Sequence, residues 1–230
     1  MNGTLLVQQT TYLSILIQFL TGLVGFMGIH TSLPQPHAIL VQALKIELVV
    51  QLIEFFFYVF LIVRFNLKNM ATLRYYDWFI TTPTMLFTTS LVYHYLSHSK
   101  DTSLTLTSFV QQYKQPLLWM VFSNFGMLMM GYLGEIGIIS MELATLTGFM
   151  FLMGTFYILY QSFGKSLASS ESWIFSLFVG VWSFYGIVFL LPPVWKNTTY
   201  NFLDIVAKNF FGLYLFWKIR QLSKNNKSKE

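Results

Sequence analysis

Two oppositely charged pairs of residues stand inside apolar segments of this sequence. Arg74 and Asp77 form one pair, and Asp204 and Lys208 form the other, four residues apart and therefore on one face of a helix. An ionisable side chain at the centre of a membrane helix costs about 2.5 to 3.5 kcal/mol on insertion scales, so such residues indicate a functional site. The four charges sum to zero, and a buried salt-bridge cluster that joins two helices is one interpretation. Schiff-base chemistry is the other, because a lysine in an apolar setting is suited to it.

Seven apolar stretches must position these residues. Each has about the 20 residues that a helix needs to cross a membrane, and a helix satisfies all its backbone hydrogen bonds without water. The stretches cover residues 6–30, 38–64, 71–95, 115–137, 139–161, 171–193 and 199–219. We therefore predict an all-α membrane protein, a seven-transmembrane-helix bundle that forms one domain from 1 to 230, with a flexible basic tail from 221 to 230.

The composition excludes several functional classes. Of the 230 residues, 55% are hydrophobic and 10% are charged, against about 25% charged residues in soluble domains. An ordinary soluble protein, a disordered chain and a nucleic-acid-binding protein are therefore excluded. The chain has no cysteine, which excludes disulfides, thiol catalysis and thiolate metal sites. Its histidines form no cluster that would bind a metal, and we predict neither a metal site nor an enzyme.

The basic residues predict an orientation in the membrane. Five of them crowd the C-terminal end, namely Lys218, Arg220, Lys224, Lys227 and Lys229. By the positive-inside rule the C-terminus is cytoplasmic and the N-terminus extracellular. Two glycosylation sequons, Asn2-Gly3-Thr4 and Asn197-Thr198-Thr199, both fall on the outer side in this topology. At the outer ends of the fourth and fifth spans, Glu135 and Glu142 are expected to be solvated helix caps.

Three motifs carry a resemblance to a known family. Residues 74–83 read R-x-x-D-W-x-x-x-T-P, residues 182–185 read W-x-x-Y and residues 204–208 read D-x-x-x-K. Together they resemble the retinal-binding signature of the microbial rhodopsins, and the resemblance extends over all seven spans.

The resemblance assigns roles to the charged residues. It implies that Lys208 binds all-trans-retinal through a protonated Schiff base, with Asp77 and Asp204 as its counterions and Arg74 just outside them. It also implies a pocket, although aromatic and methionine side chains at helical spacing are usually ordinary core. The implied pocket residues are Trp78, Thr82, Met85, Met127, Gly131, Trp182, Tyr185 and Phe189. At positions 186 and 189 this chain has Gly and Phe where the family more commonly has Pro and Trp.

Polar residues also follow one face of the second stretch. Glu47, Gln51, Glu54 and Tyr58 are spaced by four, three and four residues, which aligns them along an otherwise apolar helix. We call these four residues the stripe. The stripe is either a polar contact between helices or part of a cation path, since acidic rings and stripes select cations in channels.

The stripe resembles the second span of channelrhodopsins and of a group of giant-virus rhodopsins. In that group a Ser, two Glu and an Asn line an ion path, and the matching residues here are Ser14, Glu47, Glu54 and Asn209, with Gln51 between them. We therefore favour a light-gated channel that conducts monovalent cations and protons. It would lie in the lipid bilayer as a multi-pass protein, in the host cell membrane if the protein is viral. The algal channelrhodopsins link spans three and four through a pair that corresponds to Thr82 and Asn124 here.

Two other functions stay open. An outward proton pump of this family needs a cytoplasmic carboxylic acid at the position of Thr88, and Thr cannot supply a proton near neutral pH. The paired release acids of the pumps are also missing from the segment between Val194 and Tyr200. A pump would therefore be slow, with water as the donor. A sensory rhodopsin would act through a separate partner protein, and a homo-oligomer also stays open.

Overall fold

The structure is a computed structural model that describes residues 3–98 and 101–227. Its main helices are α1 (Gly3–Ile29), α2 (Ala38–Val63), α3 (Leu67–Ser97), α5 (Lys114–Glu135), α6 (Met141–Ser162) and α7 (Ser172–Val188). The seventh rod consists of α8 (Pro193–Asp204), the π turn η2 (Ile205–Asn209) and α9 (Phe210–Lys227). Short elements lie between the rods, α4 (Leu106–Gln112) and η1 (Gly164–Ser166). The predicted seven-helix bundle is confirmed.

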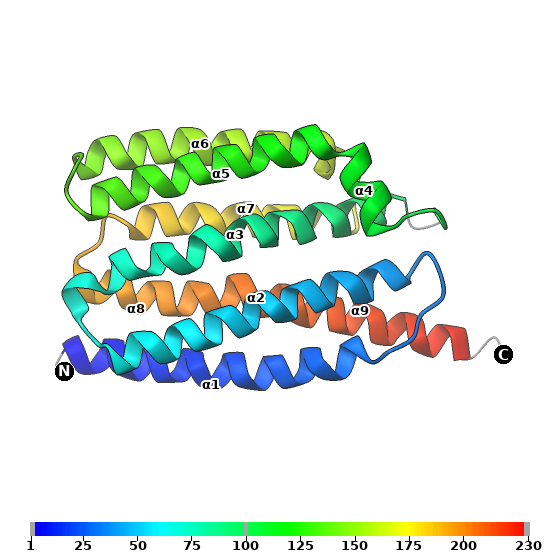
Figure 1. Cartoon of the computed structure of the whole chain (residues 1–230), viewed down its shortest axis with the longest axis horizontal. Coiled ribbons are helices and arrows are strands. Elements are labelled where there is room, and N and C mark those ends of the chain that lie inside the picture. The colour runs from blue at the N-terminus through cyan, green and yellow to red at the C-terminus, as the bar shows by residue number, and fades with distance from the viewer. Residues whose placement is uncertain (1–2, 99–100, 228–230) are drawn as a thin grey trace.

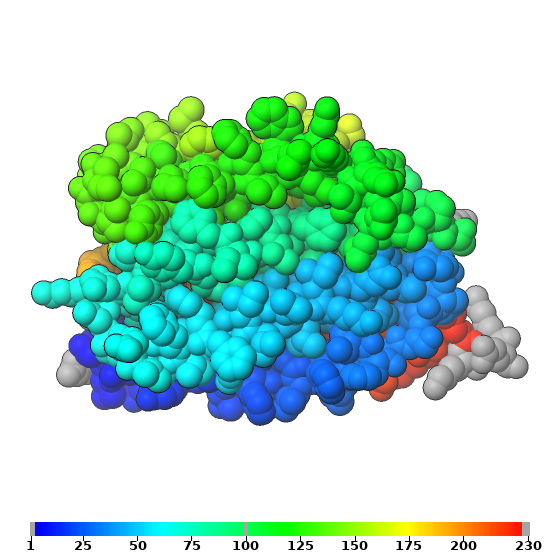
Figure 2. Space-filling view, in the orientation of Figure 1, coloured from blue at the N-terminus to red at the C-terminus, as the bar shows by residue number. Residues whose placement is uncertain are grey.

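The seven rods run side by side along the long axis of the molecule, and the described chain enters at one end and leaves at the other (Figure 1). We call the end that holds Gly3 the N-end and the end that holds Lys227 the C-end. In this view α5 and α6 form the top layer, α3 and α7 lie below them, and α1, α2 and the seventh rod form the bottom. Figure 2 shows the face made by α1, α2, α3 and α5, on which side chains of neighbouring helices pack closely.

The outward faces of the helices are apolar. Among the described helices, α1, α2, α5 and α6 are each long and apolar enough to cross a membrane. Large apolar side chains point away from the bundle on these helices, for example Leu16, Phe56, Phe122 and Met150, each more than half exposed. The remaining rods are shorter or contain the buried charges. Lipid would cover such a surface, whereas a soluble protein rarely exposes apolar patches of this extent.

Several helix ends differ from the expected boundaries. The sixth span ends at Val188 and the seventh begins at Pro193, because a proline at the first helical position favours a helix start. The expected flexible tail is wrong for residues 221–227, which continue α9 as a helix. Residues 228–230, like Asn2 of the first sequon, lie outside the described residues.

The connection between the third and fourth spans is polar and partly helical. Thr105 caps α4 in a capping box with Ser108. Nearby, hydrogen bonds from the hydroxyl and backbone N–H of Ser103 hold the pKa of the exposed Asp101 carboxyl below its usual value. The segment therefore satisfies its own polar groups at the C-end.

Candidate functional site

The Lys208 amine lies at the centre of three buried carboxyl groups. Its Nζ is 2.6 Å from Asp77 Oδ2, 3.4 Å from Glu54 Oε1 and 4.0 Å from Asp204 Oδ1. These acids come from α3, α2 and α8, and all four side chains are at most 3% exposed. The structure therefore brings Asp77 and Asp204 together with Lys208, as the sequence predicts. It adds Glu54, which the sequence analysis places only in the stripe.

The two predicted counterions have different partners. Asp204 accepts hydrogen bonds from Tyr58 (2.5 Å) and Tyr185 (2.6 Å) and pairs with Arg74 Nη1 at 3.0 Å. Asp77 accepts a hydrogen bond from Lys208 through Oδ2, while its Oδ1 has no hydrogen-bond partner among the described residues. Asp77 is therefore the carboxylate that holds the amine, and Asp204 belongs mainly to the arginine.

Arg74 lies between the amine site and the N-end. It donates to Tyr58 at 2.7 Å, to Asn201, and to Asn197 over 3.4 Å. Asn201 in turn donates to Thr10 in α1 at 2.8 Å. A buried guanidinium needs such partners, because removing a charge from water is costly unless it is paired and hydrogen-bonded. The predicted position of Arg74 just outside the counterions agrees with these contacts.

The site contains one acidic group more than the neutral set of two cations and two anions that the sequence suggests. Lys208 and Arg74 supply two positive charges, and Asp77, Asp204 and Glu54 supply three acidic groups. An unbalanced charge in a low-dielectric interior is unfavourable. The cluster is neutral when one of the three carboxyl groups holds a proton, so the site can store a proton beside the amine.

A largely apolar cavity extends from Lys208 across the bundle. It begins at the seventh rod, passes between α3 and α7, and ends at α5 and α6, which lie on the far side of the molecule (Figure 1). All eight pocket residues implied by the resemblance line it: Trp78, Thr82, Met85, Met127, Gly131, Trp182, Tyr185 and Phe189. An amine at one end of an apolar, aromatic-walled cavity fits a polyene aldehyde such as retinal.

The sequence does not identify several residues of the cavity wall, including all those of α6, as parts of the pocket. The cavity is also lined by Tyr75, Leu128, Ala144, Thr145, Gly148, Phe149, Leu152, Gly186, Tyr200 and Ala207. Most are small or apolar and carry no motif, so the sequence offers no signal that separates them from core residues. The glycine at 186 has a structural reason, since a Cβ there would approach the Phe149 ring to 2.7 Å. Phe149 thus fills the space that a larger residue at 186 would occupy.

The comparisons with known proteins agree with this arrangement. A family profile described as bacteriorhodopsin-like protein matches residues 6–222. The chain belongs to this family. It is therefore a multi-pass membrane protein and a retinal-binding microbial rhodopsin, in a family of photoreceptors and transporters rather than enzymes.

Solved rhodopsin structures share the fold over nearly the whole chain. The viral rhodopsin OLPVRII is 26% identical, with a TM-score of 0.81 over 94% of this chain and 99% of that chain. The rhodopsin of Exiguobacterium sibiricum is 18% identical, with a TM-score of 0.75 over 96% and 98% of the two chains. Xanthorhodopsin, a light-driven ion pump with dual chromophore, is 17% identical, with a TM-score of 0.74 over 98% and 96%. A search of the curated proteins finds no match.

In this rhodopsin the stripe is divided among three separate networks. Glu47 accepts a hydrogen bond from Thr88 in α3. Gln51 donates to Thr21 in α1 and, at 2.5 Å, to Asn209. Glu54 and Tyr58 face Lys208 and Asp204, as described above. Polar contacts between helices are therefore present along the stripe, and they join α2 to α1, α3 and the seventh rod.

Two other predicted residues of the path and one predicted pair can also be placed. Ser14 is buried in α1 and accepts from Gln18 at 3.0 Å. Asn209 lies in the π turn directly after Lys208. Thr82 accepts a hydrogen bond of 2.8 Å from Asn124, which links α3 to α5.

One expectation at the N-end is wrong, and one of the two sequons is buried there. Glu135 is not a solvated cap, because both of its carboxylate oxygens bind Lys196, at 3.1 and 2.9 Å. Asn197 is fully buried, and its amide donates to Pro193 O at 2.9 Å. A buried, hydrogen-bonded side chain cannot accept a glycan in the folded protein, so the sequon at 197 gives no support to the topology.

Proposed function

We propose that this rhodopsin is a light-gated cation channel, with all-trans-retinal attached to Lys208. The observation that carries the proposal is the 3.4 Å contact between Lys208 Nζ and Glu54 Oε1. Through it, the group that binds the chromophore touches the stripe directly. Retinal, when bound, supplies the absorption of light and a change of shape at the lysine nitrogen.

The chain's own residues couple that change to the path. Glu54 has no hydrogen-bond partner for either oxygen among the described residues, so the charge on Lys208 is its main attraction. A displaced nitrogen leaves Glu54 free to turn toward α1 and to hydrate. The proposed path lies between α1, α2, α3 and the seventh rod. Two further contacts block it, one between Gln51 and Asn209 and one between Glu47 and Thr88. Opening requires that both contacts separate.

The proposal includes the orientation and the extent of the protein. The C-end, with its basic residues, faces the cytoplasm, and the N-end faces outside. The chain forms a single retinal-binding domain, and the likeness to a viral rhodopsin supports a host cell membrane as its location. Monovalent cations and protons are the conducted ions.

One contact favours the alternative of an outward proton pump. Thr88 stands at the position of the pumps' cytoplasmic donor, and its hydroxyl donates to the Glu47 carboxyl. A carboxyl group is therefore present at the donor site after all, supplied by α2 rather than α3. Glu47 is 3% exposed and lies between Lys208 and the C-end, so it can return a proton to the amine from that side.

Voltage-clamped photocurrents distinguish the two functions. A channel current reverses with the driving force, whereas a pump current keeps its direction at all voltages. We expect reversal, and we expect Glu54→Gln to change the current size or the reversal potential in asymmetric cation solutions. Glu171→Gln is the matched control, since Glu171 pairs with Lys218 at the C-end, away from the stripe. A current that never reverses would overturn the channel and leave the pump.

A further inference from the structure

An ion pair at the N-end joins the fourth span to the seventh. Glu135 is the last residue of α5, and Lys196 lies in the first turn of α8. Their contact is bidentate, with Nζ 3.1 Å from Oε1 and 2.9 Å from Oε2. The Lys196 and Glu135 side chains are only 6% and 12% exposed, so water screens this pair far less than a surface pair. Neither residue touches the Lys208 amine site.

The pair lies against the far end of the cavity. Lys196 Nζ is 5.0 Å from the centroid of the Phe189 ring, and Phe189 lines the cavity. Gly134, the neighbour of Glu135, is packed so tightly that a Cβ there would meet Ala144 at 2.5 Å and Phe189 at 3.0 Å. Ala144 belongs to the cavity wall on α6. One aromatic ring therefore separates the ammonium group from the end of the cavity opposite Lys208.

A charge at this place acts on the chromophore in a defined direction. Excitation of a conjugated, positively charged imine moves positive charge from the nitrogen toward the far end of the polyene. A cation near that far end raises the energy of the excited state, and an anion lowers it. In the intact pair the two charges oppose each other, so their fields largely cancel inside the cavity.

We propose that the Glu135–Lys196 pair closes the far end of the retinal cavity and keeps it electrostatically neutral, which makes both residues determinants of the absorption maximum. The pair acts through the Phe189 wall and the field, without touching the chromophore. Its loss as a unit leaves the field almost unchanged, whereas the loss of one partner exposes the charge of the other.

The inference rests on the attachment of retinal to Lys208 proposed above, and the two can fail separately. If the attachment is wrong, either wild-type protein stays colourless with retinal or Lys208→Ala keeps its colour. If only the present inference is wrong, the protein is coloured and the variants below fail to show the expected pattern.

The test compares absorption maxima of four purified proteins: wild type, Glu135→Gln, Lys196→Met and the double variant. We expect Glu135→Gln, which leaves the ammonium group, to absorb at shorter wavelength than the double variant. Lys196→Met, which leaves the carboxylate, should absorb at longer wavelength, each shift being on the order of 5 to 10 nm. Wild type and double variant should agree within about a third of that shift. Any other pattern, including four equal maxima, would overturn the proposal.

Two further proteins keep the test decisive if a single variant folds poorly. Lys196→Arg retains the charge and the bidentate contact, and it should keep the wild-type maximum. Lys218→Met breaks the pair with Glu171, which has the same chemistry at the opposite end of the bundle, and should leave the maximum in place. A shift from Lys218→Met as large as that from Lys196→Met would show that the colour responds to any lost ion pair and would overturn the proposal.

Discussion

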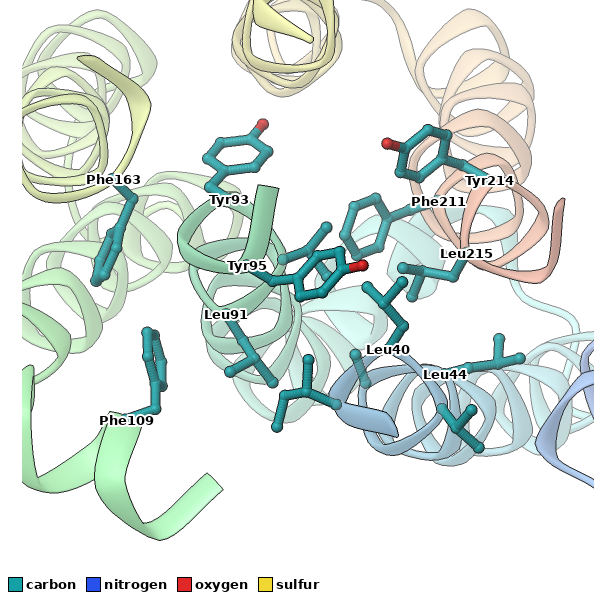
Figure 3. Close-up of a cluster of buried hydrophobic side chains, with 14 of the residues drawn as sticks. Leu40, Leu44, Leu91, Tyr93, Tyr95, Phe109, Phe163, Phe211, Tyr214 and Leu215 are labelled. Carbon is teal, nitrogen blue, oxygen red and sulfur yellow. The ribbon is translucent and has the colours of Figure 1, made fainter. Parts of the chain in front are cut away.

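The two halves of the bundle are filled with different chemistry. From Lys208 toward the N-end the interior is polar, with Arg74, Tyr58, Asn197 and Asn201 joined in one hydrogen-bonded network. Toward the C-end the interior is an apolar cluster in which side chains of α2, α3, α4 and α9 meet (Figure 3). Figure 3 shows Leu40 and Leu215 pointing toward each other, with the Phe109 and Phe163 rings on the opposite side of α3. In the proposed channel, this apolar cluster would be the barrier to ions, on the C-end side of Lys208.

The difference also separates two kinds of stabilisation. The polar half depends on specific partners, because an unpaired charge there costs several kcal/mol. The apolar half depends on close packing, since in a membrane the surrounding lipid is as apolar as the core. Substitutions on each side of Lys208, and at Lys208 itself, test this contrast.

The largest effect is expected at the boundary between the halves. Lys208→Ala removes the amine to which we propose that retinal is attached, so the purified protein should show no visible absorption band after retinal is added. Lys218→Ala is the control, since this lysine lies on α9 and pairs with Glu171, and that protein should stay coloured. Colour in the Lys208 variant would place the linkage on another residue.

In the polar half, Arg74→Gln should lower the stability strongly. The substitution removes the closest cation of Asp204 and leaves only Lys208, at 4.0 Å, and breaking a buried pair in this way costs about 3 to 5 kcal/mol. Thermal unfolding in detergent, followed by loss of colour, measures the change. Arg64→Gln at the exposed end of α2 is the matched control, with little expected change. Equal unfolding temperatures for the two variants would mean that the polar network contributes no stability.

In the apolar half, Leu44→Ala should have a smaller effect. Leu44 is 1% exposed and packs against Gly28 and Phe216. Truncating a buried leucine to alanine lowers the free energy of unfolding by about 2 to 5 kcal/mol, and we expect about 2 because lipid contacts lessen the loss. Leu52→Ala on the lipid-facing side of the same helix serves as the comparison, at 54% exposure. The same unfolding assay applies, and a larger loss at Leu52 would refute the packing argument.

The sequence predicts much of this molecule because charges inside apolar segments are rare. The seven rods, the pairing of Lys208 with Asp77 and the eight pocket residues all follow from spacing and from the family signature. The rods form as predicted because each apolar stretch has the length of a membrane crossing. What spacing cannot provide is the rotation of one helix relative to another, so the contact of Glu54 with Lys208 was not foreseen.

Two polar residues near helix ends show what the sequence leaves open. Glu135 and Asn197 lie where polar residues usually face solvent, and the sequence alone predicts a solvated cap for Glu135. In the structure the partners of these residues come from distant segments, Lys196 for the first and Arg74 for the second. Only the packing of α5 and α3 against the seventh rod reveals those partners.

The π turn at Ile205–Asn209 carries a consequence for the seventh rod. A π turn contains one residue more than an α-helical path of the same span, and each residue of an α-helix advances the direction of side chains by about 100°. If the same residues were wound as an unbroken α-helix, all of α9 would turn by roughly that angle relative to α8. Asn209 would then swing away from Gln51, and Leu215 would leave the apolar cluster. The extra residue thus sets the phase between the half of the rod that holds Asp204 and the half that packs into the apolar cluster.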